Sequence, residues 1–459
     1  MRSSEPNIST PTRLSTAAFV VLCSMIVFAV ITYGAVDALA TSILGVGTLV
    51  LVLLWVWDGW SSGGLQIGYN VLLLPFIGLS VLGILQLLPL ASATPGSDVL
   101  RVPASAALSM DPFATRMFVV RTILLTIFFA AAFLHINTVS RIKKTAIFVL
   151  SFGTLMAFFG IIQKLADPGA IYGMRETPQA IPFGPYVNQH HFASLMVMLS
   201  GPAIGLIASR IRRDMLPLLL IAAAMMAIAV VFSGSRGGML SYAAMAATIA
   251  AAYMMRRGDA ADGDERSKLA TFLPAAAGMA LLAMVIVGAV IMLGAGENLL
   301  RGVGLGGVTD DVSSGRLHVW QVALQIFASN PVVGAGLDAF GTAFTMFDTR
   351  NGMFRVEQAH NDYLQILADG GIVGFLCVAV FIFILLKQGL ARMRGAAGDW
   401  VASLQVGAFA GCVGVLVHSF FDFPLRTHAN AYVFLLLAVV AVQPIVLEAR
   451  RRRTSERSR

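Results

Sequence analysis

Apolar runs long enough to cross a lipid bilayer recur along the chain, separated by short polar connections. A helix needs about 20 apolar residues to span the hydrocarbon core, and runs of this kind extend from Ala17 to Val446. Of the 459 residues, 57% are hydrophobic and 12% are charged, whereas soluble domains carry about 25% charged residues. Since so few charges cannot cover a water-facing surface, the sequence predicts an all-α, polytopic integral membrane protein.

The apolar runs predict about twelve membrane-spanning helices. These are expected near residues 17–35, 38–57, 69–90, 117–136, 145–164, 188–208, 215–233, 236–255, 270–293, 362–387, 400–421 and 428–447. The first run is longer than the roughly 7–15 residues of a signal-peptide core, so it is interpreted as a retained helix, with cleavage near Ala38 or Ala40 as the alternative. We expect one polytopic membrane domain over residues 1–459, ending in a basic cytoplasmic tail at 448–459.

The basic residues indicate which connections face the cytoplasm, because cytoplasmic loops are enriched in Lys and Arg. Basic clusters fall at alternate connections, and both termini are therefore expected on the cytoplasmic side. The clusters are Arg141/Lys143/Lys144, Arg210/Arg212/Arg213, Arg256/Arg257, Lys387/Arg392/Arg394 and Arg450 to Arg453. The formal charge of +8 is thus interpreted as a topology signal, with no nucleic-acid partner.

The remaining connections are expected on the outer side, and they include the short connection Phe421–Thr427 and a long loop at 294–361. Loops beyond about 12–15 residues are usually functional or disordered. Val319, Trp320, Ala323, Ile326 and Phe327 recur at helical spacing, which predicts an amphipathic helix lying on the membrane surface. The loop is therefore expected to be partly helical and functional.

The segment Phe232-Ser-Gly-Ser-Arg-Gly-Gly-Met239 places Arg236 between two apolar helices on the expected outer side. An arginine there opposes the usual charge bias and needs an anionic partner or water. Hydroxyls of Ser233 and Ser235, together with backbone amides at the start of the next helix, complete a candidate phosphate seat. The alternative is an arginine that extends its guanidinium to lipid headgroups.

Two further segments carry candidate chemistry. Arg316 begins the amphipathic helix. Together with Arg236 it would supply a second guanidinium, which could bind further oxygens of a diphosphate. The alternative is that Arg316 is a solvated surface charge. In Gln358-Ala-His-Asn-Asp-Tyr-Leu-Gln365, the imidazole of His360 is a candidate proton acceptor. Asp362 is expected to orient His360 or to cap the following helix, and Asn361 and Tyr363 are candidate substrate ligands.

A fourth polar segment, Tyr186-Val-Asn-Gln-His-His-Phe-Ala193, opens another helix. Asn188, His190 and His191 are candidates for binding sugar hydroxyls or phosphate, with helix capping as the alternative. A metal site built from these histidines with His360 and Asp362 is disfavoured, because no helix presents an i, i+4 ligand pair and thiolate ligands are absent. We expect no metal and no cofactor.

Three of these segments, in this order, resemble the O-antigen ligase and Wzy-type polymerase superfamily of bacterial membrane glycosyltransferases. The resemblance rests on Ser-Gly-Ser-Arg-Gly-Gly at 233–238, on Arg316 and Trp320 followed by Asn-Pro-Val-Val-Gly-Ala-Gly at 330–336, and on Ala-His-Asn-Asp-Tyr-Leu-Gln at 359–365. It covers roughly residues 180–425. One departure is His190, where the family often has asparagine, and this leaves the role of His190 open.

The resemblance implies that Arg236 and Arg316 hold the diphosphate of an undecaprenyl-linked glycan and that His360 assists the acceptor. The expected reaction is a metal-independent, inverting glycosyl transfer at the periplasmic face. The acceptor is either lipid A–core, in a ligase, or a growing O-antigen or exopolysaccharide chain, in a polymerase. A protein O-oligosaccharyltransferase and a multi-span secondary transporter are the alternatives. The transporter is disfavoured, because the polar motifs gather on one face instead of at the midplane of broken helices.

Overall fold

The computed structural model describes residues 12–91, 106–166, 170–178, 180–208, 214–258, 316–350, 355–393 and 399–444. These residues are almost entirely helical, which confirms the all-α class. The elements in chain order are α1 (Arg13–Ile31), α2 (Ala38–Ser62), η1 (Val71–Leu73), α3 (Leu74–Gln86), α4 (Pro112–His135), α5 (Val139–Ala166), β1 (Ala170–Ile171), β2 (Arg175–Glu176), α6 (Gln189–Ile207), α7 (Leu216–Phe232), α8 (Arg236–Gly258), α11 (Arg316–Ser329), α12 (Phe340–Phe347), α13 (Asp362–Met393), α14 (Trp400–His418), η2 (Pro424–Arg426) and α15 (His428–Val442). The two short strands form one antiparallel hairpin.

Eight of the described helices are long and apolar enough to cross a membrane, namely α1, α2, α4, α5, α6, α8, α13 and α14. The stretch Val71–Gln86 and the helices α7 and α15 are shorter apolar elements. Each expected span except 270–293 coincides with one of these helices, and the polytopic membrane architecture is confirmed. The segment 270–293, much of the loop 294–361, the cluster Arg210 to Arg213 and the tail 448–459 lie outside the described residues, so the count of twelve stays a prediction.

The centre of the bundle is formed by α6 packed against α14, and most residues of both helices are buried. A helix that is apolar all round is typically a buried one. Glycines allow the two backbones to approach closely, since a Cβ on Gly201 would lie 2.4 Å from the carbonyl oxygen of Gly407. Small residues at such contacts are typical of membrane helices. This rigid pair fixes the start of α6 and the end of α14, and both ends carry site residues.

Helix α13 contains the expected span 362–387 and has a break in it at Gly371. Gly371 has φ of +60° and ψ of −160°, and its freed neighbours donate elsewhere: Ile372 N–H bonds the Pro331 carbonyl at 2.9 Å. A Cβ on Gly371 would lie 2.4 Å from the Val332 carbonyl oxygen, so glycine is required. The helix bends sharply there, because a Cβ on Gly374 would lie 3.6 Å from the Ile366 carbonyl oxygen.

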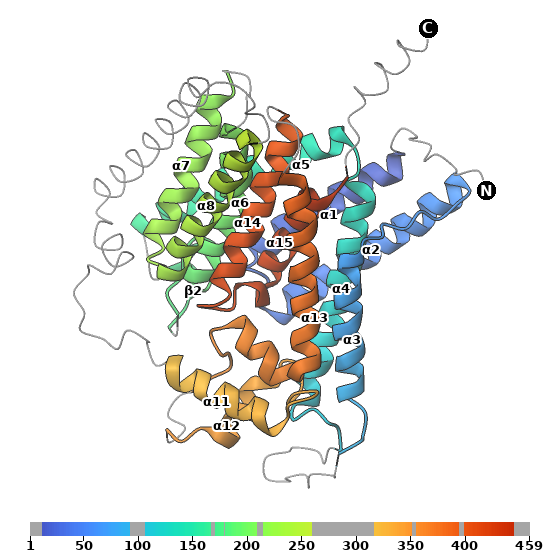
Figure 1. The fold of residues 1–459 in the computed structure, drawn as a ribbon, viewed down its shortest axis with the longest axis vertical. Helices are drawn as coiled ribbons and strands as arrows, with labels where there is room; N and C mark the ends of the chain where they lie inside the picture. Colours follow the sequence, from blue (N-terminus) through green and yellow to red (C-terminus); the bar gives the residue numbers. More distant parts are fainter. Residues whose placement is uncertain are drawn as a thin grey trace.

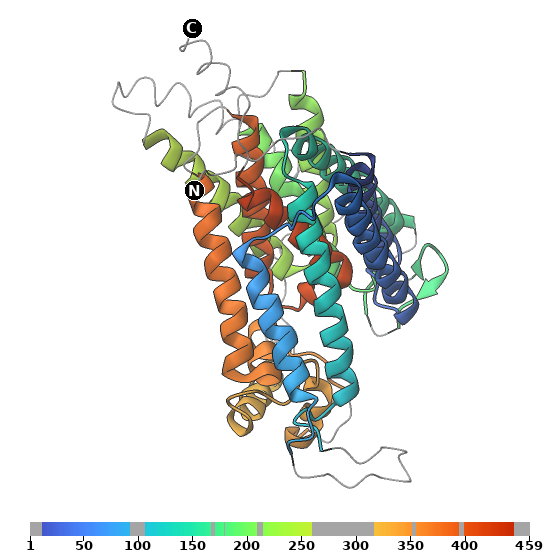
Figure 2. The same ribbon diagram turned by 90° about the vertical axis from the view of Figure 1, so that its right-hand side faces the viewer.

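The amphipathic helix predicted in the long loop is confirmed as α11. Its buried face, formed by Val319, Val322, Ala323 and Ile326, packs with α12 and with residues Ala359 and Ala368. Figures 1 and 2 show α11 and α12 at one end of the bundle, beside the ends of α3, α4 and α13. The position of α11 on the membrane surface stays a prediction.

Candidate active site

Four helices, α6, α8, α11 and α13, begin close to one another, and the connection 419–427 between α14 and α15 lies among their starts. Hydrogen bonds join these segments in pairs: α6 to α8, α11 to the connection, and α13 to the connection. In Figure 1 this region lies between the helices α6 to α8 and the pair α11 and α12. The start of a helix carries positive dipole character, so the arrangement favours an anion.

The turn before α8 is shaped by its two serines. The Ser233 hydroxyl donates to the Val230 carbonyl at 2.6 Å and accepts from Ser235 N–H at 3.2 Å, and the Ser235 hydroxyl accepts from Gly238 N–H at 3.0 Å. Both serine side chains are buried. The hydroxyls therefore act first on the backbone, and the turn they stabilise leaves the Arg236 side chain exposed.

Arg236 and Arg316 are brought to the same region. The charges of both arginines act on the His190 ring, as do those of His360 and Asp422, so His190 lies within electrostatic range of all four. Arg316 donates from Nη1 to the Phe421 carbonyl, and this anchors the first turn of α11 to the connection. The structure thus gathers the two arginines and the histidine that the sequence proposed as catalytic groups.

His190 has a clear contact, although its role was open from the sequence. Its Nδ1 lies 2.9 Å from the Ser235 hydroxyl, which ties the first turn of α6 to the turn that presents Arg236. Asn188 is the N-cap of α6, since its side-chain oxygen accepts from His190 N–H at 2.8 Å. The capping alternative for Asn188 is therefore confirmed.

His191 is buried, and its contacts point to the connection between α14 and α15. Its Nδ1 lies 2.8 Å from the Thr427 hydroxyl, and its backbone carbonyl accepts from the Asn430 side chain at 2.9 Å. Its ring meets that of Phe423 edge to face, with centroids 4.8 Å apart. His191 therefore positions the connection, and its proposed contact with substrate stays a prediction.

His360 faces a carboxylate that the sequence did not identify. Its Nδ1 lies 3.2 Å from Oδ1 of Asp422, and the His360 side chain is 38% exposed. With the Nδ1 proton donated to Asp422, Nε2 carries the lone pair. The backbone of His360 has φ of +51°, a left-handed conformation that is uncommon and strained in non-glycine residues and that clusters at functional sites.

Asp422 is 1% exposed, yet it is held in its charged form. Burial acts to raise the pKa of its carboxyl, but the hydrogen bond from His360 and the nearby His191 and His190 hold that pKa below its usual range. Oδ1 also accepts from Phe423 N–H at 3.0 Å, whereas Oδ2 is buried with no hydrogen-bond partner in the described part of the chain. Asp422 is therefore an ionised group suited to orient His360 and to stabilise its imidazolium.

Asn361, Asp362 and Tyr363 fasten the start of α13. Asn361 caps it, accepting from Tyr363 N–H at 3.0 Å, and the Tyr363 hydroxyl donates to the Leu416 carbonyl at 2.6 Å. Asp362 accepts from the Ser419 hydroxyl at 2.9 Å. Asp362 therefore neither caps the helix nor faces His360. Contacts of these three residues with substrate stay predictions.

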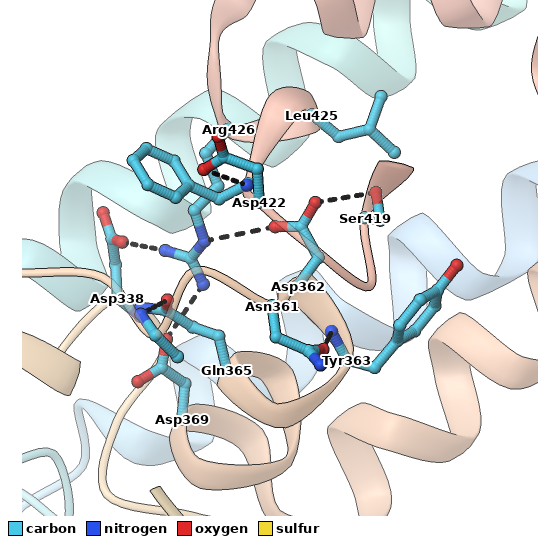
Figure 3. A network of polar contacts seen from close by, with 12 residues as sticks. Asp338, Asn361, Asp362, Tyr363, Gln365, Asp369, Ser419, Asp422, Leu425 and Arg426 are labelled. Atoms are coloured by element: carbon cyan, nitrogen blue, oxygen red, sulfur yellow. Dashed lines mark hydrogen bonds and ion pairs between the residues drawn. The ribbon is translucent and has the colours of Figure 1, made fainter. Parts of the chain in front are cut away.

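Arg426 lies at the centre of a buried ionic network (Figure 3). Its guanidinium pairs with Asp338, with Asp369 at 3.0 Å and with Asp362 at 3.8 Å. Burial acts to lower its pKa, but the three carboxylates together raise it above the usual value. Asp338 lies in the loop before α12, and Asp362 and Asp369 lie at the two ends of the first part of α13. The network therefore ties these segments to the connection that carries both Arg426 and Asp422.

The connection 419–427 is the part of the site that sequence reasoning missed. The sequence places the connection between the expected spans 400–421 and 428–447 on the outer side but assigns no chemistry to it. Two signals were present: an aspartate and an arginine in a short turn between two strongly apolar helices, where ionisable groups are costly and usually functional. Within the described ranges, no group of three or more His, Cys, Asp or Glu side chains is arranged to hold a metal ion.

The comparisons with known proteins agree with this geometry. Residues 221–379 match the model of the O-antigen ligase family, and the matched segment contains Arg236, Arg316 and His360. No curated protein matches the chain. The segment 221–379 is therefore similar to the O-antigen ligase family, and the resemblance of the chain to the O-antigen ligase and Wzy-type polymerase superfamily is confirmed.

Proposed function

We propose that the protein transfers a glycan from an undecaprenyl-diphosphate carrier to an acceptor sugar at the periplasmic face of the inner membrane. The observation that carries the proposal is the His360–Asp422 pair, whose partly exposed imidazole lies in the same electrostatic cluster as Arg236 and Arg316. A base beside two cations is the arrangement that displacement of a diphosphate by a hydroxyl requires.

The diphosphate is assigned to Arg236 and Arg316. Two guanidinium groups offer several N–H donors, and each can bind two oxygens. The starts of α6, α8, α11 and α13 add positive dipole character around the same region. These groups stabilise the negative charge that develops on the departing diphosphate, which is commonly a large share of catalysis.

The acceptor is activated by His360. An acceptor hydroxyl oxygen attacks the anomeric carbon, a new C–O bond forms, and the bond from that carbon to the diphosphate oxygen breaks. The electron pair leaves with the diphosphate, and the hydroxyl proton passes to Nε2 of His360. Asp422 stabilises the imidazolium that results. A single displacement of this kind inverts the anomeric centre and uses no metal.

The acceptor is either lipid A–core or a growing O-antigen or exopolysaccharide chain. The experiment expresses His360→Ala, Arg236→Ala and Arg316→Ala in cells lacking the native gene, and follows surface glycan and its lipid-linked precursor after membrane abundance has been checked. Matched controls are His318→Ala, whose ring pairs with Asp348, and Arg175→Ala, whose guanidinium pairs with Asp37.

We expect the three site variants to lose the glycan and accumulate the precursor, while both controls retain the glycan. The acceptor left unmodified then distinguishes a ligase from a polymerase, and a protein left unmodified indicates an O-oligosaccharyltransferase. Normal glycan in all three site variants would overturn the proposal and make a transporter the function to pursue.

A further inference from the structure

The imidazole of His190 contacts a buried hydroxyl whose own proton needs an acceptor. Nδ1 of His190 lies 2.9 Å from the Ser235 hydroxyl, and that hydroxyl already accepts from Gly238 N–H at 3.0 Å. Ser235 is fully buried, and within the described residues its hydroxyl has no third partner. If Nδ1 carried a proton and donated it, the hydroxyl proton would be buried without an acceptor, which is costly. Ser235 therefore donates to Nδ1 of His190.

The direction of this hydrogen bond fixes the tautomer of His190. A neutral imidazole whose Nδ1 accepts a hydrogen bond carries its proton on Nε2. Protonation of the ring would deprive Ser235 of its acceptor, and it would add a positive charge where the charges of Arg236 and Arg316 already act. His190 is therefore a neutral ring with an Nε2–H donor. His360 has the opposite tautomer and presents a lone pair on its Nε2.

The Nε2–H group of His190 is available to a ligand. The residue is only partly buried, and across the described ranges its Nε2 makes no hydrogen bond. Of the fixed charges that act on the ring, the two arginines outnumber the one carboxylate, Asp422, which is itself bonded to His360. The surroundings of His190 therefore carry an excess of positive charge, and a hydrogen-bond donor placed there suits an anion.

We propose that His190 donates a hydrogen bond from Nε2 to an oxygen of the carrier diphosphate. The inference rests on the proposed function, and it adds a neutral donor to the two guanidinium groups that hold the diphosphate. His190 keeps its proton, so it stabilises the departing diphosphate without acting as an acid. The two histidines then serve opposite ends of the transfer, since His360 accepts the proton of the acceptor hydroxyl and His190 donates to the leaving group.

The test measures binding of undecaprenyl diphosphate, which carries no sugar, to the purified full-length protein in detergent. The melting temperature is followed against the concentration of this lipid, since a ligand that binds the folded state raises it. His190→Phe keeps an aromatic ring but has no donor, whereas the amide of His190→Gln supplies an N–H donor in its place. His318→Phe is the matched control, because the His318 ring pairs with Asp348 outside the proposed site. Arg236→Ala tests the diphosphate site itself.

We expect His190→Phe to bind undecaprenyl diphosphate about 10- to 100-fold more weakly than wild type, as loss of a hydrogen bond to a charged group implies. His190→Gln and His318→Phe should bind close to wild type. Equal affinity in wild type and His190→Phe, or an equal loss in His190→Phe and His190→Gln, would overturn the inference and leave the proposed function standing. Affinity unchanged in Arg236→Ala would instead overturn the diphosphate site on which both depend.

A second measurement keeps the test decisive where His190→Phe fails to fold. The chain has seven histidines, and nitrogen NMR of isotope-labelled histidine separates ring nitrogens that carry a proton from those that do not. The signals of His190 are those missing from the spectrum of His190→Gln. We expect a proton on Nε2, none on Nδ1, and a shift of the Nε2 signal when undecaprenyl diphosphate is added. A proton on Nδ1, or an Nε2 signal that the lipid leaves unchanged, would overturn the inference.

Discussion

Arg426→Met is expected to cost far more stability than loss of another ion-paired arginine. The Arg426 side chain is 15% exposed, and its partner Asp369 is fully buried. Removing one partner of a buried ionic network leaves an uncompensated charge, which typically costs about 3–5 kcal/mol. Three carboxylates lose their shared cation here, so the upper part of that range is expected.

The matched comparison is Arg175→Met, which breaks the pair with Asp37 at 2.6 Å. The side chains of that pair are 32% and 46% exposed, and water screens them, so the expected cost is about 0–1 kcal/mol. Equilibrium unfolding of each purified variant in a denaturant series gives the free energy of unfolding, provided the slope with denaturant is unchanged.

Two further variants separate charge from geometry in the same assay. Arg426→Lys keeps the charge but loses the planar fork, so an intermediate cost is expected. Adding Asp369→Asn to Arg426→Met removes one stranded carboxylate, and the double variant should be less destabilised than the sum of the two single changes. Costs for Arg426→Met and Arg175→Met that agree within about 0.5 kcal/mol would refute the inference that the network stabilises the site.

Three other predictions concern the site and its support. Asp422→Asn should lower transfer about 10²- to 10⁴-fold, the usual range for loss of acid–base assistance. Because the pKa of Asp422 is depressed in the folded state, its contribution to stability is present above its unfolded pKa of about 3.9 and is lost as the pH falls through the folded pKa. The unfolding free energies of wild type and of Asp422→Asn should therefore converge in acid. Gly371→Ala should lower the free energy of unfolding by more than about 1–3 kcal/mol, measured by thermal or denaturant unfolding. Gly173→Ala is the control, because Gly173 also has a positive φ but no atom lies within 4 Å of the added Cβ. It should incur only the cost of the left-handed backbone conformation. Tyr186→Phe removes a buried hydroxyl that donates to Asn430 at 2.9 Å and should cost about 1 kcal/mol in the same measurement; an unchanged unfolding free energy would contradict it.

The sequence by itself determined the membrane helices and three members of the candidate site. A spanning helix satisfies its backbone hydrogen bonds internally, so length and hydropathy along the chain suffice to locate it, and the described spans agree. Arg236, Arg316 and His360 stood out because polar and charged groups between apolar helices are costly and therefore noticeable. These are local signals.

Only the tertiary structure decided the partners of those residues. His360 and Asp422 are 62 positions apart, and Asp362, the nearer carboxylate in sequence, bonds Ser419 instead. The break in α13 at Gly371 likewise depends on what packs against it. Distant side chains meet only once helices are packed, and hydrophobicity, which places a helix in the membrane, does not specify the neighbour it contacts.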